Sequence, residues 1–316
     1  MLGEFEQIAQ IMAPLAQKAK GAFGLKDDAA VFQVNSGDEM VVTTDTLIAG
    51  VHFFADDPAE TIAHKLLAVN LSDLAAMGAQ PRYYTLNTSY PSEVKLDWIK
   101  QFANGLKQMQ DEYGIILLGG DTTRTPGPLC LSVTAFGCVP ERQALKRTTA
   151  RVGDLICVSN TIGDGALGLL VAQGKIEDKS GHLLKSYRRP IPRTKLGPKL
   201  VGLATSCMDI SDGLLSDFGH MGVGGEIDLA KIPLSPAAQQ VLAEDSTLFP
   251  TILNGGDDYE LLFCIDPKDK DRMLDTGETC DCQISVIGRI TEGYDLVVLD
   301  ETAQKVDIKT NGYRHF

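Results

Sequence analysis

The stretch NLSDLAAMG, residues 70–78, places one aspartate inside an apolar segment that ends in glycine. Pro58 stands early in the segment that leads to it and Gly78 closes it, which are the positions that proline and glycine favour at the two ends of a helix. We therefore predict a helix over 58–77 that carries Asp73. The neighbours of Asp73 are apolar, so we expect a partly buried carboxylate, which needs a cation or hydrogen-bond donors. An exposed aspartate would be an ordinary helix residue, and the stretch alone favours a functional role only slightly.

Strands and helices follow one another irregularly on both sides of this helix. Upstream, the pattern predicts an amphipathic helix over 4–20 and strands over 29–34 and 39–44, joined by a hairpin turn at 35–38. Downstream, we expect a strand over 82–89, a helix over 97–113, a short strand over 115–118 and a strand over 129–139. Strand pairs mixed with helices are typical of an α+β fold rather than of strict β-α-β alternation.

A polar and basic segment over 141–153 separates two halves of the chain and predicts a domain linker. Beyond it we expect strands over 154–159 and 259–265, helices over 163–173, 199–204 and 214–221, a loop or broken helix over 185–198, and short strands within 283–316. The length of 316 residues agrees with two domains. We place the N-terminal domain at 1–140 and the C-terminal domain at 150–316.

The composition is that of a soluble globular protein with an acidic excess. Hydrophobic residues make up 44% of the chain, and the formal net charge of −13 disfavours binding to nucleic acids and anionic membranes. No apolar run reaches the about 18 residues of a membrane span, and the first residues lack the pattern of a signal peptide. The seven cysteines are scattered, which argues against a disulfide framework and favours the cytoplasm. An acidic enzyme that acts on anionic phosphates must bind cations, so bound metal is expected.

Aspartates recur at strand ends, in glycine-rich turns and, once, on a helix. They are Asp27, Asp28, Asp45, Asp73, Asp121, Asp209, Asp212, Asp257 and Asp258. Carboxylates on loops suit Mg²⁺, which keeps several waters and binds one or two carboxylates together with substrate phosphates. Aspartate is also common in turns and at helix N-caps, so each residue has an ordinary structural interpretation. The adjacent pair Asp27-Asp28 is more suggestive, because neighbouring carboxylates repel each other unless a cation joins them.

The segment GGDTT, residues 119–123, follows a short apolar strand and is a candidate phosphate contact. Two glycines let the main chain approach a phosphate or a ribose, and Asp121 next to them can hold a metal; an ordinary tight turn explains the pattern equally well. The chain lacks the P-loop pattern, the protein-kinase catalytic loop and the GxSxG motif. His52 lies in a loop soon after Asp45, where it can donate to a phosphate, and Arg147 lies in the linker.

The ordered set of motifs resembles the thiamine-monophosphate kinase family, of the superfamily that includes aminoimidazole ribonucleotide synthetase. The matching segments of the first half are GEF at 3–5, DDAA at 27–30, TTDTL at 43–47, GVHF at 50–53, VNLSDLAAMG at 69–78 and GGDT at 119–122. Those of the second half are DISDGL at 209–214, GGDDYEL at 255–261 and GYRHF at 312–316. Each segment is weak alone, but their common order is specific.

The resemblance implies both a fold and a reaction. The fold would be the two-domain aminoimidazole ribonucleotide synthetase-like α+β fold, with an N-terminal mixed sheet that forms a barrel in a homodimer and a C-terminal α/β sandwich. The reaction would be the ATP-dependent phosphorylation of thiamine phosphate to thiamine diphosphate by direct in-line transfer with several Mg²⁺ ions. A phosphomonoester is mostly dianionic at pH 7, so its oxygen can attack without a strong general base.

The resemblance also assigns roles by position. The magnesium ligands would be Asp28, Thr43, Thr44, Asp45, Asp73, Asp121, Asp209 and Asp212. The ATP contacts would be Tyr113, Gly120, Asp121, Arg147 and Ser211, and the contacts to thiamine phosphate would be His52, Asp257 and Tyr313. Two positions depart from the family pattern: Lys26 stands where the family has glycine, and Asp257 stands where it has glutamate.

Two other functions remain open at this level. A purine-precursor synthetase of the same superfamily would use ATP on the same fold, although the segments around His52 and Tyr313 favour the thiamine branch. A non-catalytic nucleotide-binding or metal-binding protein would keep the ligands without turnover. Selenophosphate synthetase-like members carry a reactive residue near the N-terminus and hydrogenase-maturation relatives end in cysteine, whereas this chain has no cysteine before Cys130 and ends in Phe316.

Overall fold

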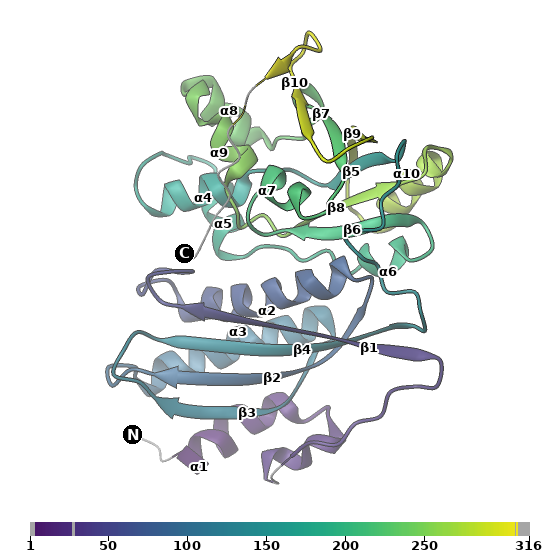
Figure 1. Cartoon of the computed structure of the whole chain (residues 1–316). Coiled ribbons are helices and arrows are strands. Elements are labelled where there is room, and N and C mark those ends of the chain that lie inside the picture. Colours follow the sequence, from purple (N-terminus) through teal and green to yellow (C-terminus); the bar gives the residue numbers. More distant parts are fainter. Residues whose placement is uncertain (1–3, 27–28, 307, 309–316) are drawn as a thin grey trace. The chain divides into compact units, whose positions relative to one another are not determined.

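The computed structural model describes residues 4–26, 29–306 and 308, and it divides the chain into two compact units (Figure 1). Unit 1 comprises Met1–Leu74 and Ala79–Arg142, and unit 2 comprises Ala75–Gly78 and Gln143–Phe316. The final passage from unit 1 to unit 2 lies in a polar segment, between the last strand of unit 1 and the first strand of unit 2. No helix within the described residues is long and apolar enough to span a membrane.

Unit 1 opens with short helical turns and continues with strands and two long helices. The helical elements are α1 (Glu4–Gln7), η1 (Ile8–Met12), η2 (Ala13–Ala16), η3 (Lys20–Leu25), α2 (Ala59–Ala76) and α3 (Leu96–Tyr113). The strands are β1 (Asp38–Ile48), β2 (Gln80–Tyr90), β3 (Ile116–Arg124) and β4 (Cys130–Pro140). The predicted helices over 58–77 and 97–113 are confirmed, and so are the predicted strands over 82–89 and 129–139.

The strands of unit 1 form a mixed sheet in the order β1-β4-β2-β3. Strand β4 runs antiparallel to β1 and β2, whereas β2 and β3 are parallel, so β1 and β3 are the two edges. Helices α2 and α3 cover one face of this sheet (Figure 1). Along β4, Leu131, Val133 and Ala135 are fully buried toward these helices, while Ser132 and Thr134 lie on the other face, called the open face below.

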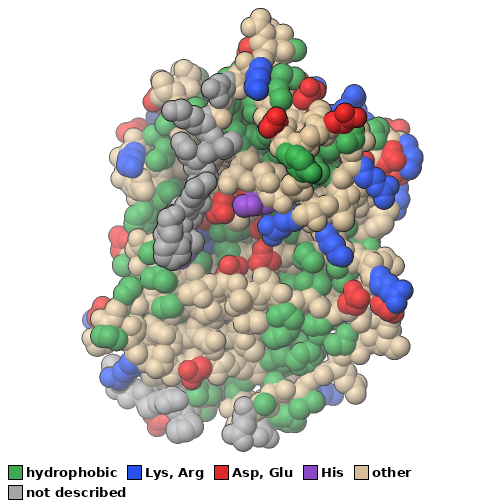
Figure 2. All heavy atoms as spheres, in the orientation of Figure 1, with side chains coloured by type: hydrophobic (Ala, Val, Ile, Leu, Met, Phe, Trp, Pro, Cys, Tyr) green, Lys and Arg blue, Asp and Glu red, His purple; other side chains and the backbone are tan. Residues whose placement is uncertain are grey.

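The open face of unit 1 carries mainly hydrophobic and uncharged side chains (Figure 2). Phe32 lies over it, with its ring centroid 5.4 Å from that of Tyr83 and 5.7 Å from that of Phe136. The prediction of a strand over 29–34 is therefore wrong. The apolar residues of this segment pack over the sheet instead of pairing within it, and β1 begins only at Asp38.

The predicted continuous helix over 4–20 is also replaced by shorter elements. A helical turn, a π-helical turn and a 3₁₀ turn follow one another from α1 to η2. Pro14 lies in the first turn of η2, and a proline inside an α-helix has no N–H for the hydrogen bond to the preceding turn. The buried side chains Ile11, Met12 and Leu15 nevertheless join the core of unit 1, as expected for an amphipathic segment.

Strand β3 extends further than the sequence predicted, since it continues through the glycine pair to Arg124. It pairs in parallel with β2 over this whole length, with Leu86 opposite Gly120 and Asn87 opposite Asp121. A Cβ atom on Gly120 would lie 1.7 Å from the carbonyl oxygen of Leu86. The close approach of the two strands therefore requires glycine at this position.

Unit 2 alternates short helices with the strands of one large sheet. Its helical elements are α4 (Asp164–Ala172), α5 (His182–Arg188), α6 (Gly197–Leu200), α7 (Leu214–Gly219), η4 (Leu229–Lys231), α8 (Pro236–Glu244), η5 (Ser246–Leu248), α9 (Phe249–Asn254), η6 (Pro267–Asp269) and α10 (Lys270–Thr279). Its strands are β5 (Leu155–Ser159), β6 (Ala204–Ile210), β7 (Gly224–Asp228), β8 (Glu260–Ile265), β9 (Ile284–Thr291), β10 (Leu296–Leu299) and β11 (Lys305–Val306).

The sheet of unit 2 has the order β11-β10-β7-β9-β5-β8-β6, and it is antiparallel except for the parallel pair β10-β7. Helices cover both of its faces, with one hydrophobic cluster around α4, α7 and α9 and another around α6 and α10. Every residue of the inner strand β8, which lies between β5 and β6, is buried for this reason. The predicted α+β fold with a mixed N-terminal sheet and a C-terminal α/β layer structure is confirmed.

Candidate active site

Three of the predicted magnesium ligands lie together in unit 1, between β1 and α2. Residues Thr43, Asp45 and Leu47 alternate with residues of the open face, and Leu47 is buried in the core beneath α2. Asp73 on α2 is half-buried, as predicted, and its Oδ2 accepts a hydrogen bond of 2.5 Å from the hydroxyl of Thr43. The side chains of Thr43, Asp45 and Asp73 are thus directed into the same space.

The electrostatics of this group suit a cation. Burial, together with the neighbouring carboxylate of Asp73, raises the pKa of Asp45 to about 6. Two neighbouring carboxylates disfavour each other's charged form, but a hard cation bound between them makes the charged form of both favourable. The donor set, two carboxylates with a hydroxyl, consists of the oxygen ligands that Mg²⁺ prefers.

Thr44 does not join this group through its side chain. Its hydroxyl donates to the carbonyl oxygen of Val133 at 2.9 Å and accepts from the hydroxyl of Thr134 at 3.2 Å. The side chain of Thr44 therefore lies on the open face, opposite to Thr43 and Asp45. A metal held by Asp45 and Asp73 is out of reach of its hydroxyl.

His52 lies in the loop after β1 with a defined ring orientation. Its Nδ1 accepts a hydrogen bond of 3.0 Å from the main-chain N–H of Ile48, which places the ring proton on Nε2 in the neutral form. The ammonium group of Lys65, a buried residue of α2, donates to the carbonyl oxygen of His52 at 3.2 Å. The loop is thus anchored at both its ring and its main chain, and the ring presents an N–H donor.

Gly120 and Asp121 line a cavity of about 420 Å³ in unit 1. The N-terminal turns contribute Leu25 to its wall, and Phe32 and Phe136 supply aromatic surface. Its volume lies in the range of small-molecule sites, and its wall combines apolar residues with one exposed carboxylate. Tyr113 ends α3 and packs against the core of unit 1, so the described lining does not include this predicted ATP contact.

Asp45 and Asp121 lie far apart within one chain. Asp45 is on edge strand β1 and Asp121 is on the opposite edge strand β3, with β4 and β2 between them. Adjacent strands lie about 4.8 Å apart, so three steps separate the two main chains by roughly 14 Å. Since Mg²⁺ binds oxygen at about 2.1 Å, these two carboxylates of one chain cannot share an ion.

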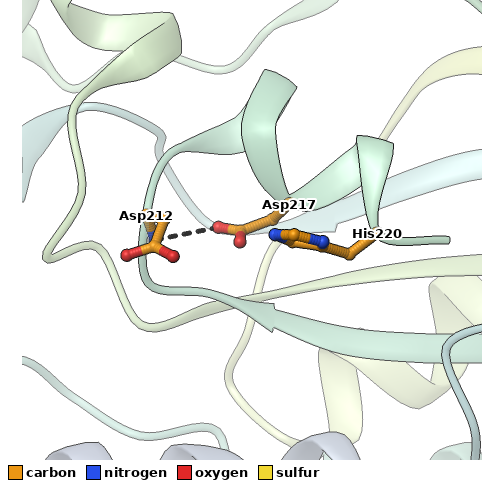
Figure 3. A group of neighbouring side chains, drawn as sticks. All are labelled: Asp212, Asp217 and His220. Carbon is orange, nitrogen blue, oxygen red and sulfur yellow. Dashed lines mark hydrogen bonds between the residues drawn. The ribbon is translucent and has the colours of Figure 1, made fainter. Parts of the chain in front are cut away.

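In unit 2, strand β6 leads the predicted ligands into a tight loop before α7. Asp209 is buried near the end of the strand, and Ser211 and Asp212 are half-buried in the loop. One ligand atom each of Asp212, Asp217 and His220 lies within 4.8 Å of the others (Figure 3). Asp217 stands between the other two, and burial raises the pKa of its carboxyl to about 6.

The loop that carries Asp257 packs directly on this segment. The main-chain N–H of Asp257 donates to the carbonyl oxygen of Ser211 at 3.0 Å, and a Cβ atom on Gly256 would lie 2.1 Å from that same oxygen. Asp257 and Tyr259 both have positive φ, 73° and 53°, although neither is glycine. Such strained conformations concentrate at functional loops, and here they place the predicted substrate contact beside the predicted metal ligands.

The linker places Arg147 along the same strand. The hydroxyl of Ser206 donates to the carbonyl oxygen of Arg147 at 2.7 Å, and the N–H of Cys207 donates to that of Lys146. The side chain of Arg147 is exposed. The structure thus brings Asp209, Ser211, Asp212 and Asp257 together around the end of β6, whereas the main chain of Arg147 contacts β6 near its beginning, at Ser206.

Two residues of the predicted set, Asp28 and Tyr313, lie outside the described residues. Lys26, which departs from the family pattern, is exposed. The structural roles of Asp217 and Asp258 were not predicted. Asp217 could have been suspected as an acidic residue in the first turn of a helix that follows glycine, where negative charge is favourable.

Asp258 holds the start of α4 and belongs to a buried ionic cluster. Its oxygens accept from the main-chain N–H groups of Gly163 at 2.7 Å and Gly165 at 2.9 Å, while burial raises its pKa well above the usual value. Arg193 binds the buried carboxylate of Glu260 with both Nε and Nη2. Asp258 and Glu260 follow Asp257 closely in the chain, so these contacts fix the segment on the C-terminal side of Asp257.

Comparison with known families places both halves of the chain. The N-terminal domain model of AIR synthase related proteins matches residues 26–139, and the C-terminal domain model of the same proteins matches residues 151–301. Together these two matches cover most of the chain.

Individual relatives agree with this result. The thiamine-monophosphate kinase of Caulobacter vibrioides is 39% identical over 92% of this chain and 84% of its own length. The crystal structure of the thiamine-monophosphate kinase from Stenotrophomonas maltophilia superposes with a TM-score of 0.85 at 41% identity, covering 94% of this chain and 96% of that one. A structure described as "AaThiL complexed with AMPPCP and TMP" superposes with a TM-score of 0.78 at 30% identity, covering 100% of this chain and 97% of that one.

Proposed function

Because the chain belongs to the thiamine-monophosphate kinase family, we propose that it transfers the γ-phosphoryl group of ATP to thiamine phosphate and releases thiamine diphosphate and ADP. The observation that carries the proposal is the neighbour complexed with AMPPCP and TMP, which matches this chain over its whole length. AMPPCP is an analogue of ATP, so both proposed substrates have counterparts in that complex. The chain is accordingly a kinase whose acceptor group is itself a phosphate, that of thiamine phosphate.

The proposed ligands of Mg²⁺ are Asp45 and Asp73 with Thr43 in unit 1, Asp121 on β3, and Asp209 and Asp212 in unit 2, together with Asp28 outside the described residues. Thr44 keeps its proposed role only if it acts through its main chain. Bound Mg²⁺ would offset the repulsion between the two anionic substrates and stabilise charge on the transferring group. The raised pKa of Asp45 supports this set, because burial and the carboxylate of Asp73 both disfavour its charged form and a bound cation would favour it.

The remaining residues are proposed to bind and orient the substrates. The cavity beside Gly120 and Asp121 would take part of the nucleotide, with Ser211 and Arg147 as further ATP contacts and Tyr113 kept from the family pattern. His52 would donate its Nε2 proton toward thiamine phosphate, with Asp257 and Tyr313 as partners. The acceptor phosphate is mostly dianionic at pH 7, so the site needs no strong general base.

A homodimer is proposed in which the open faces of two unit 1 sheets meet. Val42 is 55% exposed on this face, and Val31 and Val34 of the covering segment are 65% and 40% exposed. Exposed apolar side chains on a sheet face and on the segment that covers it are typical of interaction surfaces. A second copy would also bring its own β3 edge, with Asp121, toward the β1 edge that carries Asp45. Asp45 of one copy and Asp121 of the other could then contribute to one site, although the two residues lie too far apart within a single chain.

A cytoplasmic location is proposed from the cysteines. All seven are free thiols, and five of them are buried. Unpaired thiols throughout a protein of this size are typical of a reducing compartment.

The proposal is tested by ADP release in a coupled assay with ATP and thiamine phosphate, with and without Mg²⁺. We expect ADP and thiamine diphosphate to form in equal amounts, and only with the metal. Aminoimidazole-type purine precursors serve as the matched alternative substrates. ADP release with a purine precursor but not with thiamine phosphate would contradict the proposal, and nucleotide binding without any product would identify a non-catalytic relative.

A further inference from the structure

Asp217 makes an unusual set of hydrogen bonds with the loop that precedes its own helix. A single carboxylate oxygen, Oδ2, accepts from three consecutive main-chain N–H groups, those of Ser211 at 3.0 Å, Asp212 at 3.0 Å and Gly213 at 3.1 Å. Asp217 is only 2% exposed. Figure 3 shows its carboxylate beside Asp212, at the start of α7.

Successive main-chain N–H groups that converge on one point form a binding place for anions, and in many enzymes such a loop binds phosphate. In this chain the protein's own carboxylate occupies that place. The N–H groups of the loop are therefore committed to Asp217, and what the loop can offer a ligand is the hydroxyl of Ser211 and the carboxylate of Asp212. A loop of this kind suits a cation rather than a bare phosphate.

The same hydrogen bonds fix the loop against its neighbour. Gly213 has a φ of 118°, and a Cβ atom there would lie 2.6 Å from main-chain atoms of Asn254. The carbonyl oxygen of Ser211 accepts from the N–H of Asp257 at 3.0 Å. Asp217 thus sets the position of two candidate ligands directly and of Asp257 through one further hydrogen bond.

We propose that Asp217 is a positioning residue for the metal–nucleotide site: it fills the anion-binding place formed by residues 211–213 and so presents Ser211 and Asp212 to Mg²⁺ and ATP. The identity of the ligands, Mg²⁺ and ATP, rests on the proposed function, whereas the hydrogen bonds between Asp217 and residues 211–213 do not depend on it. We assign no separate ion to the cluster of Asp212, Asp217 and His220, because Asp217 Oδ2 is already engaged by three donors.

The test compares Asp217→Ala and Asp217→Asn with a matched buried aspartate. Asp154 is 4% exposed and also accepts a main-chain N–H, that of Arg151, and the hydroxyl of Thr205. Its hydrogen bonds involve none of residues 211–213, so Asp154→Asn reports the general effect of altering a buried carboxylate in unit 2. Asparagine at position 217 keeps one oxygen acceptor and removes the charge, which weakens each hydrogen bond by about half.

The first readout is hydrogen exchange in the ligand-free protein. Asp217→Ala should speed exchange at the amides of residues 211–213 specifically, Asp217→Asn should do so to a smaller extent, and Asp154→Asn should leave these amides unchanged. Wild-type protection of the three amides in a folded Asp217→Ala protein would overturn the inference. This readout does not depend on which substrate the enzyme uses.

The second readout is calorimetric binding of AMPPCP with Mg²⁺. Residues that orient metal ligands change metal affinity or activity by about 10–100-fold, so we expect a dissociation constant raised by about that factor in Asp217→Ala and by less in Asp217→Asn. The KM for ATP should rise more than the KM for thiamine phosphate. An equal effect of Asp154→Asn, or an effect on thiamine phosphate alone, would contradict a positioning role.

If Asp217→Ala does not fold, Asp217→Asn tests the inference by the same two measurements, hydrogen exchange at residues 211–213 and binding of AMPPCP with Mg²⁺. Unchanged exchange and unchanged AMPPCP binding in that variant would then overturn the inference. Failure of the proposed function has a different signature, because the wild-type protein would bind AMPPCP with Mg²⁺ but would make no thiamine diphosphate.

Discussion

Thr43 on strand β1 donates its hydroxyl to Asp73 on helix α2 at 2.5 Å, and this hydrogen bond joins the sheet to the helix at the candidate metal site of unit 1. The contact connects positions that are thirty residues apart in the chain and that were both expected to bind metal. It holds the Asp73 carboxylate in place while the carboxylate of Asp45 approaches from the same strand as Thr43.

Replacement of this hydroxyl should weaken Mg²⁺ binding. Thr43→Val keeps the β-branched shape and removes the donor, so the Asp73 carboxylate loses an orienting partner, and the Mg²⁺ concentration for half-maximal activity should rise by about 10–100-fold. Thr46→Val is the matched control, because Thr46 lies on the open face of β1 and donates to Ser132 instead. Equal effects of the two substitutions would argue against the Thr43–Asp73 contact as part of the metal site.

The stability of the Mg²⁺-free protein should depend on pH through Asp45. Its pKa is raised from 3.8 to about 6 in the folded protein, so the folded state holds its proton more tightly than the unfolded state does. The stability that this proton contributes is fully present below about pH 4 and is lost as the pH rises through about 6. Thermal unfolding between pH 4 and 7 should show this loss in the wild-type protein, with a smaller loss in Asp45→Asn; Mg²⁺ should restore stability at pH 7 in the wild type only. Parallel pH profiles for the two proteins would contradict the assignment.

The two glycines of β3 should differ in their tolerance of a side chain. Gly120→Ala would place a Cβ atom 1.7 Å from the carbonyl oxygen of Leu86, so β2 and β3 must move apart. Overpacking typically costs about 1–3 kcal/mol, and a clash with rigid main chain lies at the upper end of that range. Gly119→Ala meets no atom within 4 Å and should change the free energy of unfolding by less than about 0.5 kcal/mol. Urea unfolding of both variants measures the contrast, and equal stability would show that the strands are not paired as described.

The proposed homodimer makes a prediction about mixed subunits. If each complete site takes Asp45 from one copy and Asp121 from the other, Asp45→Asn and Asp121→Asn proteins should each be inactive alone. After subunit exchange, each mixed dimer holds one site with both native aspartates, so an equimolar mixture should regain about a quarter of the wild-type activity. If each site instead draws both residues from a single chain, mixing will restore nothing.

The sequence predicted those elements whose limits are set by local chemistry. Pro58 and Gly78 marked the ends of α2, and the apolar run before Pro140 marked β4. It failed where distant pairing decides: β3 continues through Gly119 and Gly120 because β2 runs beside it, and 29–34 is not a strand because Phe32 finds aromatic partners on the open face.

The candidate site shows the same limit. The motif order predicted Asp45, Asp73 and Asp212 as ligands, and that assignment stays a prediction. Strand alternation alone does not say which face of the sheet a helix covers, so the opposite directions of the Thr43 and Thr44 side chains became clear only with α2 in place. Asp217 escaped notice because its role depends on the fold of its own helix back onto residues 211–213.

The central claim is direct phosphoryl transfer from ATP to thiamine phosphate, and a single-turnover experiment with excess enzyme, Mg²⁺ and ATP labelled at the γ-phosphate tests it. We predict that the label passes into thiamine diphosphate at the rate at which labelled ATP disappears, with none attached covalently to the protein at any time. Label that becomes covalently attached to the protein, or that appears only as inorganic phosphate while thiamine phosphate remains unchanged, would contradict the claim.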